Sequence, residues 1–180
     1  MTALSRTQGQ GPWLVNQRTD EALAERIEVA VTRKDRRKGL LGRRAFESSS
    51  ALIIAPCFSI HTMFMRFDID AVFVDDDGRA VKVVQGMTPW RIAVQPFAHA
   101  VVELPAGCLR ERPVDVGDRL YLLDGHGQRV GLSADDLLCC SLVLEAPARA
   151  WARGATGSIR EERGRHHQHK RVTDVEGRVC

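Results

Sequence analysis

Three titratable residues in the middle of the chain are the candidates for proton chemistry: His61, Asp70 and Glu103. Histidine titrates near neutral pH, so His61 can carry a proton or contact a ligand. Asp70 stands among apolar residues, where an unpaired carboxylate is costly to bury. Glu103 offers a general base, although no nucleophile accompanies it in the sequence. These residues raise one hypothesis: an enzyme that acts on a small anionic or sugar-like substrate through His61 with Glu103 or Asp70.

Arginines are the expected partners of the two carboxylates. Arg36 or Arg43 can reach Asp70 with a two-pronged hydrogen bond, which would fix a helix on a sheet. The alternative is that Arg36 or Arg43 binds the carboxylate or phosphate of a ligand. For Glu103 we expect Arg91 or Arg112 as the partner.

A basic cluster surrounds these arginines between residues 33 and 44 and contains a single acid, Asp35. Such a cluster can attract phosphate, but no glycine-rich phosphate loop or recognition-helix pattern accompanies it. We therefore favour a solvated helix face and expect no specific nucleic-acid partner. Its members are Arg33, Lys34, Arg36, Arg37, Lys38, Arg43 and Arg44.

The segment that contains Pro89, Trp90 and Arg91 is the loop best suited to binding. A tryptophan beside an arginine provides stacking and hydrogen bonding, and loops on rigid β scaffolds often carry binding sites. The other interpretation is that Trp90 folds back as a lid over the core. The sequence leaves both interpretations open.

No metal site or cofactor is expected. Cys57 precedes His61 by four residues, which along a strand is about 13 Å and too far for a catalytic pair or a shared metal. The run from Asp75 to Gly78 lacks the alternate ligands and terminal glutamate of a calcium loop. It is instead typical of a hairpin turn, because aspartate and glycine tolerate positive φ.

Alternating and continuous apolar runs predict a mainly β fold, an antiparallel β-sandwich or barrel-like domain with one or two short helices. One helix is expected near residues 33–40, with Thr32 and Asp35 in capping-box spacing and Gly39 at its end. The predicted strands cover residues 13–15, 26–31, 51–55, 58–65, 69–74, 80–85, 99–104 and 119–123.

Composition along the chain predicts four parts. Residues 1–11 form a disordered N-terminus and residues 12–125 a β domain. Residues 126–147 form a short helical extension, begun by a capping box at Ser133 and Asp136. Residues 148–180 form a disordered tail rich in basic residues and histidine, since few apolar residues are present to build a core.

The chain has 180 residues, a formal net charge of +3 and five cysteines. The odd cysteine count without any CxxC motif favours reduced thiols in the cytoplasm. The N-terminus lacks the apolar stretch of a secretory signal, and no run approaches the roughly 18 apolar residues of a membrane span. We expect a monomer or weak oligomer without a membrane partner.

Four segments resemble the motifs of the DUF192 family of bacterial and archaeal proteins. They are Arg36-x2-Gly39-Leu40-Leu41-Gly42-Arg43, the segment from Ile60 to Asp75, Val102-Glu103-Leu104-Pro105-Ala106-Gly107, and Gly117-Asp118. The resemblance covers roughly residues 13–124 and implies a compact β-sandwich without an established biochemical activity. It supplies no catalytic residues. The tryptophan common in the central motif is replaced here by His61.

The leading prediction is a non-catalytic module that binds a small polar or anionic ligand or mediates an interaction. Convergence of His61, Asp70 and Glu103 at one pocket would favour the enzyme, whereas their dispersal with Trp90 exposed would favour binding. The candidate binding residues are Arg36, Arg43, His61, Asp70, Trp90, Arg91 and Glu103.

Overall fold

The computed structural model describes residues 12–138. The predicted N-terminal segment (1–11) and the predicted tail (148–180) lie outside the described residues, as does the end of the predicted helical extension. The part of the extension that is described includes a helical stretch at residues 134–138, which begins where the Ser133 hydroxyl accepts the Asp136 N–H.

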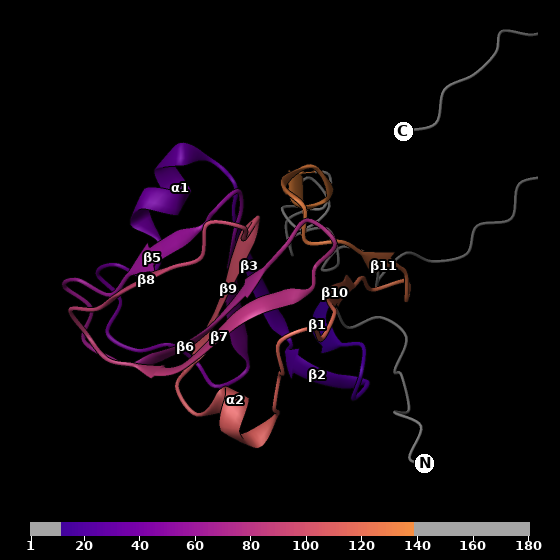
Figure 1. Cartoon of the computed structure of the whole chain (residues 1–180), viewed down its shortest axis with the longest axis horizontal. Helices are drawn as coiled ribbons and strands as arrows, with labels where there is room; N and C mark the ends of the chain where they lie inside the picture. The colour runs from indigo at the N-terminus through magenta and orange to yellow at the C-terminus, as the bar shows by residue number, and fades with distance from the viewer. Residues whose placement is uncertain (1–11, 139–180) are drawn as a thin grey trace, which may run out of the picture. The chain divides into compact units, whose positions relative to one another are not determined.

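A five-stranded sheet forms the centre of the described domain (Figure 1). Its strands, in spatial order, are β3 (Arg26–Ala30), β4 (Ser50–Ile54), β9 (Ala100–Pro105), β6 (Ile69–Val74) and β7 (Ala80–Met87). Strands β4 and β6 are buried on both faces, which explains their nearly continuous apolar sequences. All neighbouring strands are antiparallel except β3 and β4, which are parallel and joined through helix α1 (Arg33–Lys38).

A second sheet packs on one face of the central sheet. Its order is β11 (Arg129–Val130), β10 (Leu120–Leu123), β1 (Trp13–Asn16) and β2 (Glu21–Ala24). Leu14, Leu122, Ile53 and Val102 meet in the core between the two sheets. The predicted mainly β sandwich is thereby confirmed, and the sheets of the described domain do not close into a barrel.

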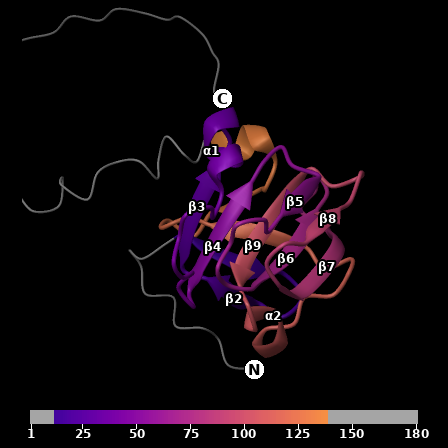
Figure 2. The same ribbon diagram turned by 90° about the vertical axis from the view of Figure 1, so that its left-hand side faces the viewer.

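The other face of the central sheet is covered by a two-stranded ribbon and by the turn after α1. The ribbon consists of β5 (Ser59–His61) and β8 (Ile92–Val94), which Figures 1 and 2 show side by side next to β6 and β7. Ile60 and Ala93 face inward and pack with Leu40 and Phe73 in a second apolar cluster. The ribbon and α1 therefore stand over the same sheet face.

Two local predictions are confirmed. The Thr32 hydroxyl accepts a hydrogen bond from the Asp35 N–H at the start of α1. Asp77 and Gly78 turn the chain between β6 and β7, which pair antiparallel. Gly78 has φ +77°, and a Cβ atom there would lie 2.5 Å from the Leu120 carbonyl oxygen, so this turn requires glycine.

The predicted strand 58–65 is wrong beyond His61. Thr62 turns the chain there, because its carbonyl accepts the N–H groups of Met65 and Trp90 and its hydroxyl donates to the Thr88 carbonyl. Strands β2 and β8 and helix α2 (Cys108–Glu111) were not predicted, since each has only three or four residues and little periodicity. Across residues 12–138, no helix has the length and apolar character to span a membrane.

Candidate functional site

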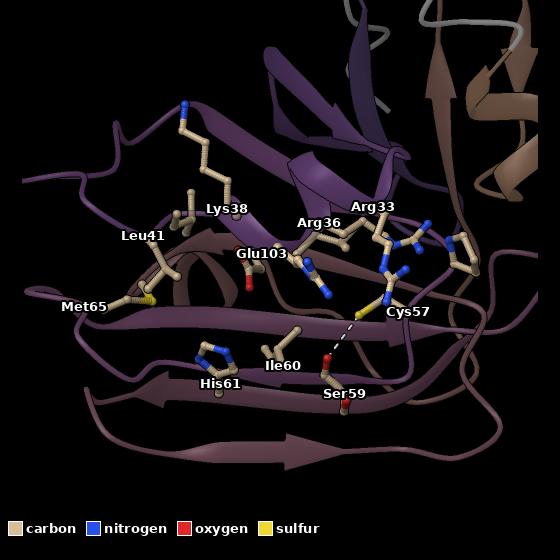
Figure 3. Close-up of a pocket in the computed structure, with 15 residues that line it drawn as sticks. Arg33, Arg36, Lys38, Leu41, Cys57, Ser59, Ile60, His61, Met65 and Glu103 are labelled. Atoms are coloured by element: carbon tan, nitrogen blue, oxygen red, sulfur yellow. Dashed lines mark hydrogen bonds between the residues drawn. The ribbon is translucent and has the colours of Figure 1, made fainter.

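A pocket of about 330 Å³ lies between α1 and β5, above the central sheet (Figure 3). Helix α1 supplies cations, β5 supplies Ser59, Ile60 and His61, and the turn after α1 supplies Leu40 and Leu41. The floor contains Glu103 from β9. Elements far apart in sequence thus combine cations, a carboxyl group and apolar side chains in one concave site.

Strand register places Glu103 on the pocket side of the sheet. Glu103 stands directly opposite Leu52 on β4 and Ala71 on β6, and both neighbours belong to the cluster under α1 and the ribbon. The residue is only 5% exposed, and its Oε2 atom is buried without a hydrogen-bond partner. The expected partners, Arg91 and Arg112, do not reach it: Arg112 donates to the Leu23 carbonyl instead.

Burial raises the pKa of Glu103 to about 7, while the positive charge of Arg43 acts in the opposite direction. Desolvation prevails because the carboxylate lacks hydrogen bonds that would compensate for lost water. Glu103 therefore changes protonation state close to neutral pH, which gives the pocket a group that can either donate or accept a hydrogen bond.

The rim of the pocket is cationic. Arg33, Arg36 and Arg37 share one side of α1 because they are spaced three and four residues apart. Arg36 Nη1 donates to the Val31 carbonyl at 2.7 Å and the Ala55 carbonyl at 3.4 Å, which orients the guanidinium. In Figure 3, Arg36 and Glu103 both point into the space between α1 and β5. The helix face that we predicted to be solvated therefore forms one wall of the pocket at Arg33, Arg36 and Arg37.

His61 and Cys57 also line the pocket. His61 lies at the end of β5 and is exposed. The Cys57 thiol donates to the Ser59 carbonyl at 3.1 Å, and burial raises the pKa of Cys57. A thiol with a raised pKa is a poor nucleophile at neutral pH. Within residues 12–138, His, Cys, Asp and Glu side chains nowhere gather in a group of three able to hold a metal ion.

Asp70 is not part of this pocket. It stands opposite Leu104, on the sheet face that packs against the second sheet, and is buried. Its carboxylate accepts the Gly86 N–H at 2.7 Å and the Leu109 N–H at 2.9 Å. The predicted ion pair with Arg36 or Arg43 is therefore wrong, because backbone donors of β7 and α2 satisfy the charge locally.

Arg43 instead forms a two-pronged ion pair with Glu28 on β3, with oxygen–nitrogen distances of 2.6 and 2.7 Å. Its charge still influences Glu103 electrostatically. Arg43 thus lies near the pocket without lining it.

Trp90 is 59% exposed, which excludes the lid interpretation. Trp90 and the exposed Arg91 lie in the loop between β7 and β8, outside the pocket lining. The predicted candidates therefore fall into different places: Arg36, His61 and Glu103 share the pocket, whereas Asp70, Trp90 and Arg91 do not. The sequence interpretation missed Cys57, Arg33 and Lys38 as pocket residues, although the helical spacing of the cations was a usable signal.

The geometry defines a β-sandwich domain with a pocket that has a cationic rim and a carboxyl group in its floor. The model of the DUF192 family, described as "Uncharacterized ACR", matches residues 14–122, and the chain belongs to this family. The predicted resemblance is confirmed.

Two archaeal relatives agree with this assignment. The UPF0127 proteins of Pyrococcus furiosus and Pyrococcus abyssi are 39% and 38% identical over 63 residues, which are 34% of this chain. The chain spans about half the length of these relatives, 53% in each case.

Two bacterial crystal structures have a similar fold. A "putative transcription regulator" from Sinorhizobium meliloti matches with a TM-score of 0.54 and 20% identity, covering 63% of this chain and 95% of that one. A protein of unknown function from Novosphingobium aromaticivorans matches with a TM-score of 0.53 and 19% identity, covering 67% and 90%. At these identities the similarity concerns the fold alone.

Proposed function

We propose that the domain is a binding module whose pocket between α1 and β5 holds a small ligand with an anionic group and a hydrogen-bonding hydroxyl or amine. The observation that carries this proposal is the buried, unpartnered Oε2 atom of Glu103. Buried polar atoms in proteins nearly always have a partner, so an orphaned one facing a pocket is well explained by a missing ligand. The pocket volume of about 330 Å³ suits a small molecule.

The two ends of such a ligand have different partners in the pocket. Arg33, Arg36 and Lys38 offer positive charge to a carboxylate or phosphate. Glu103 offers hydrogen bonding to a hydroxyl or amine in the floor, and its pKa of about 7 lets it act as donor or acceptor. Ile60 and Met65 supply apolar contact between these ends. Specificity would come from the distance between the anionic and polar groups.

A second candidate is an enzyme that uses Glu103 and His61 on such a ligand. Two observations favour it: both residues line the same pocket, and burial raises the pKa of Glu103 to about 7, which suits a general acid or base. Binding remains our first proposal because Asp70 lies elsewhere, Trp90 is exposed and Cys57 carries a raised pKa.

Within the same proposal the protein works in the cytoplasm. The thiols of Cys57 and Cys108 are free, which supports a reducing compartment. Cell fractionation followed by immunoblotting tests this point, and recovery of the protein outside the cytoplasm would contradict it.

A thermal-shift screen with anionic metabolites and sugar phosphates tests the pocket. A ligand at 100 times its Kd stabilises the folded state by about 2.7 kcal/mol. We expect compounds that raise the Tm of the wild type but not of Glu103→Gln or Arg36→Met. The matched control is Arg26→Met, an exposed arginine of β3 paired with Glu47 outside the pocket.

Two outcomes would contradict the binding proposal. In the first, the compounds raise the Tm of all four proteins equally; in the second, no compound raises the Tm of the wild type. Mass spectrometry of each active compound after incubation then separates the candidates, because conversion that depends on His61 and Glu103 would make the protein an enzyme.

A further inference from the structure

A surface of exposed apolar side chains covers the β5–β8 ribbon and its connecting loops. Eight large apolar side chains are exposed among residues 12–138, and six of them belong to this region. Exposed apolar groups that cluster in this way mark interaction sites, whereas scattered ones need no explanation. We call this set the ribbon surface: Phe58, Phe64, Trp90, Ile92, Val94 and Phe97.

Phe64 and Trp90 form an aromatic pair within the ribbon surface. Phe64 is 71% exposed, and the two rings meet edge to face with centroids 4.7 Å apart. Both residues have φ +64°, a conformation that is unfavourable for bulky side chains. Backbone strain of this kind concentrates at functional sites, so two strained and exposed aromatic residues in contact point to a binding role.

Thr62 holds both loops in place. Its carbonyl accepts the N–H groups of Met65 and Trp90, and its N–H donates to the Arg91 carbonyl. Its hydroxyl donates to the Thr88 carbonyl at 2.7 Å and accepts the Arg91 N–H at 3.0 Å. The aromatic pair is therefore pre-organised, which lowers the entropy lost on binding.

The charge around the aromatic pair is positive. Arg66 and Arg91 are exposed beside Phe64 and Trp90, and Asp68 is the only acid in residues 57–68 and 88–98. The cations of α1 stand across the pocket from β5. A binding partner for this surface must therefore be anionic where it meets the arginines.

The partner must also offer an apolar medium. Ile92 and Val94 are exposed aliphatic residues on the outer face of the ribbon, and they offer no aromatic face for the base stacking that single-stranded nucleic-acid sites use. They gain free energy only by leaving water. The loops between β5 and β6 and between β7 and β8, which carry Phe64 and Trp90, lie at the left-hand end of the ribbon in Figure 1.

We propose that the ribbon surface docks on the face of an anionic lipid bilayer. Phe64 and Trp90 enter the interfacial layer, where aromatic rings are favoured, and Arg66 and Arg91 contact lipid phosphates. This contact needs no membrane-spanning segment, and it differs from the expectation of no membrane partner. It is independent of the proposed pocket ligand, because none of these four residues lines the pocket.

Sedimentation of the full chain with vesicles tests the proposal. The probes are vesicles of phosphatidylcholine alone and of phosphatidylcholine with phosphatidylglycerol, at low and high salt. We expect binding only to the anionic vesicles, weakened by salt, and weaker by at least about tenfold in the Phe64→Ala/Trp90→Ala variant. The matched control, Val116→Ala, removes an exposed apolar side chain outside the ribbon surface and should bind as the wild type does.

Fluorescence and a charge variant complete the test. Trp90 should show a blue shift with anionic vesicles that is missing in Trp90→Phe. Arg66→Gln/Arg91→Gln, which leaves the aromatic pair intact, should lose the preference for phosphatidylglycerol. The proposal is overturned if the aromatic variant sediments like the wild type, or if no vesicle binds at low salt. Two further results would overturn it. One is that the protein binds a single-stranded oligonucleotide but no vesicles. The other is that it forms a dimer in analytical ultracentrifugation that the Phe64→Ala/Trp90→Ala variant no longer forms.

Discussion

Glu103 and Asp70 are acidic residues on neighbouring strands, yet strand register gives them opposite environments. Glu103 pairs with Ala71 and faces the pocket, while Asp70 pairs with Leu104 and faces the core between the sheets. Asp70 accepts two backbone hydrogen bonds and Glu103 Oε2 accepts none. Asp70 is therefore a structural residue, and Glu103 is the candidate for chemistry.

The stability of the wild type should fall as the pH rises from about 4.5 to about 7, relative to Glu103→Gln. The unfolded glutamate ionises near 4.5, whereas the folded one keeps its proton until about 7, so the folded state is penalised across this interval. The difference should level off above pH 7 at on the order of 3 kcal/mol. Urea unfolding at several pH values measures it, and parallel profiles for the two proteins would disprove the raised pKa.

Asp70→Ala should destabilise the domain by roughly 1–5 kcal/mol. The substitution leaves the buried Leu109 N–H and the partly buried Gly86 N–H without an acceptor, and such a group costs about 1–3 kcal/mol when it is fully buried. Chemical denaturation measures the change. Asp68→Ala, an exposed carboxylate two residues away, is the control and should stay within about 0.5 kcal/mol. Equal effects of the two substitutions would contradict this role.

The sequence predicted the important residues more accurately than it predicted the hydrogen-bond partners of those residues. The cost of burying Asp70 was foreseen from its apolar neighbours, but its backbone partners come from β7 and α2, 16 and 39 residues away. The hydrogen bond from Leu109 depends on helix α2, whose four residues are too few to show a helical period in the sequence. Likewise, the sequence marked Glu103 as a possible general base on a predicted strand, but only the positions of α1 and β5 around it make it part of a pocket.

At the scale of elements, long strands were predictable and short ones were not. Strands β4, β6 and β9 have five or six residues with apolar runs, and all three were predicted within one or two residues. Strands β5 and β8 have three residues each, too few for a period of two to be seen. Their length is set by the hydrogen bonds of Thr62, which end the ribbon.

Thr62→Val should loosen the loops at the end of the ribbon. The substitution keeps the shape but removes the hydroxyl that bonds Thr88 and Arg91, at a cost of about 1–3 kcal/mol. Amide exchange at Arg91 should accelerate more than exchange in β6. Thr88→Val, whose side chain is exposed, is the control. Unchanged exchange at Arg91 would show that the backbone bonds alone hold the loops.

At the scale of the whole molecule, the sandwich extends past the family match. Leu132 and Leu137 are fully buried in the core between the two sheets, although the match ends at residue 122. Both leucines belong to the predicted helical extension (126–147), outside the predicted β domain (12–125), because neither lies in a predicted strand. The second sheet and these leucines together complete the core.

A fragment of residues 12–147 should therefore fold as stably as the full chain, whereas residues 12–125 should lose roughly 3–6 kcal/mol. The estimate counts two buried leucines at about 1.5–3 kcal/mol each. Thermal unfolding of both fragments beside the full chain gives the comparison. Equal stability of the two fragments would show that residues 126–138 contribute nothing to the core.

The central claim is that the Glu103 carboxyl group belongs to a ligand-binding pocket, and one measurement tests it most directly. The side-chain carboxyl of Glu103, labelled with carbon-13 and assigned through Glu103→Gln, is titrated by NMR with and without the most strongly stabilising compound from the thermal-shift screen. We predict a midpoint near pH 7 for the free protein, as burial implies, and a displaced midpoint when the compound is bound. A midpoint at the ordinary value of 4.5 that the compound leaves unchanged would contradict the account.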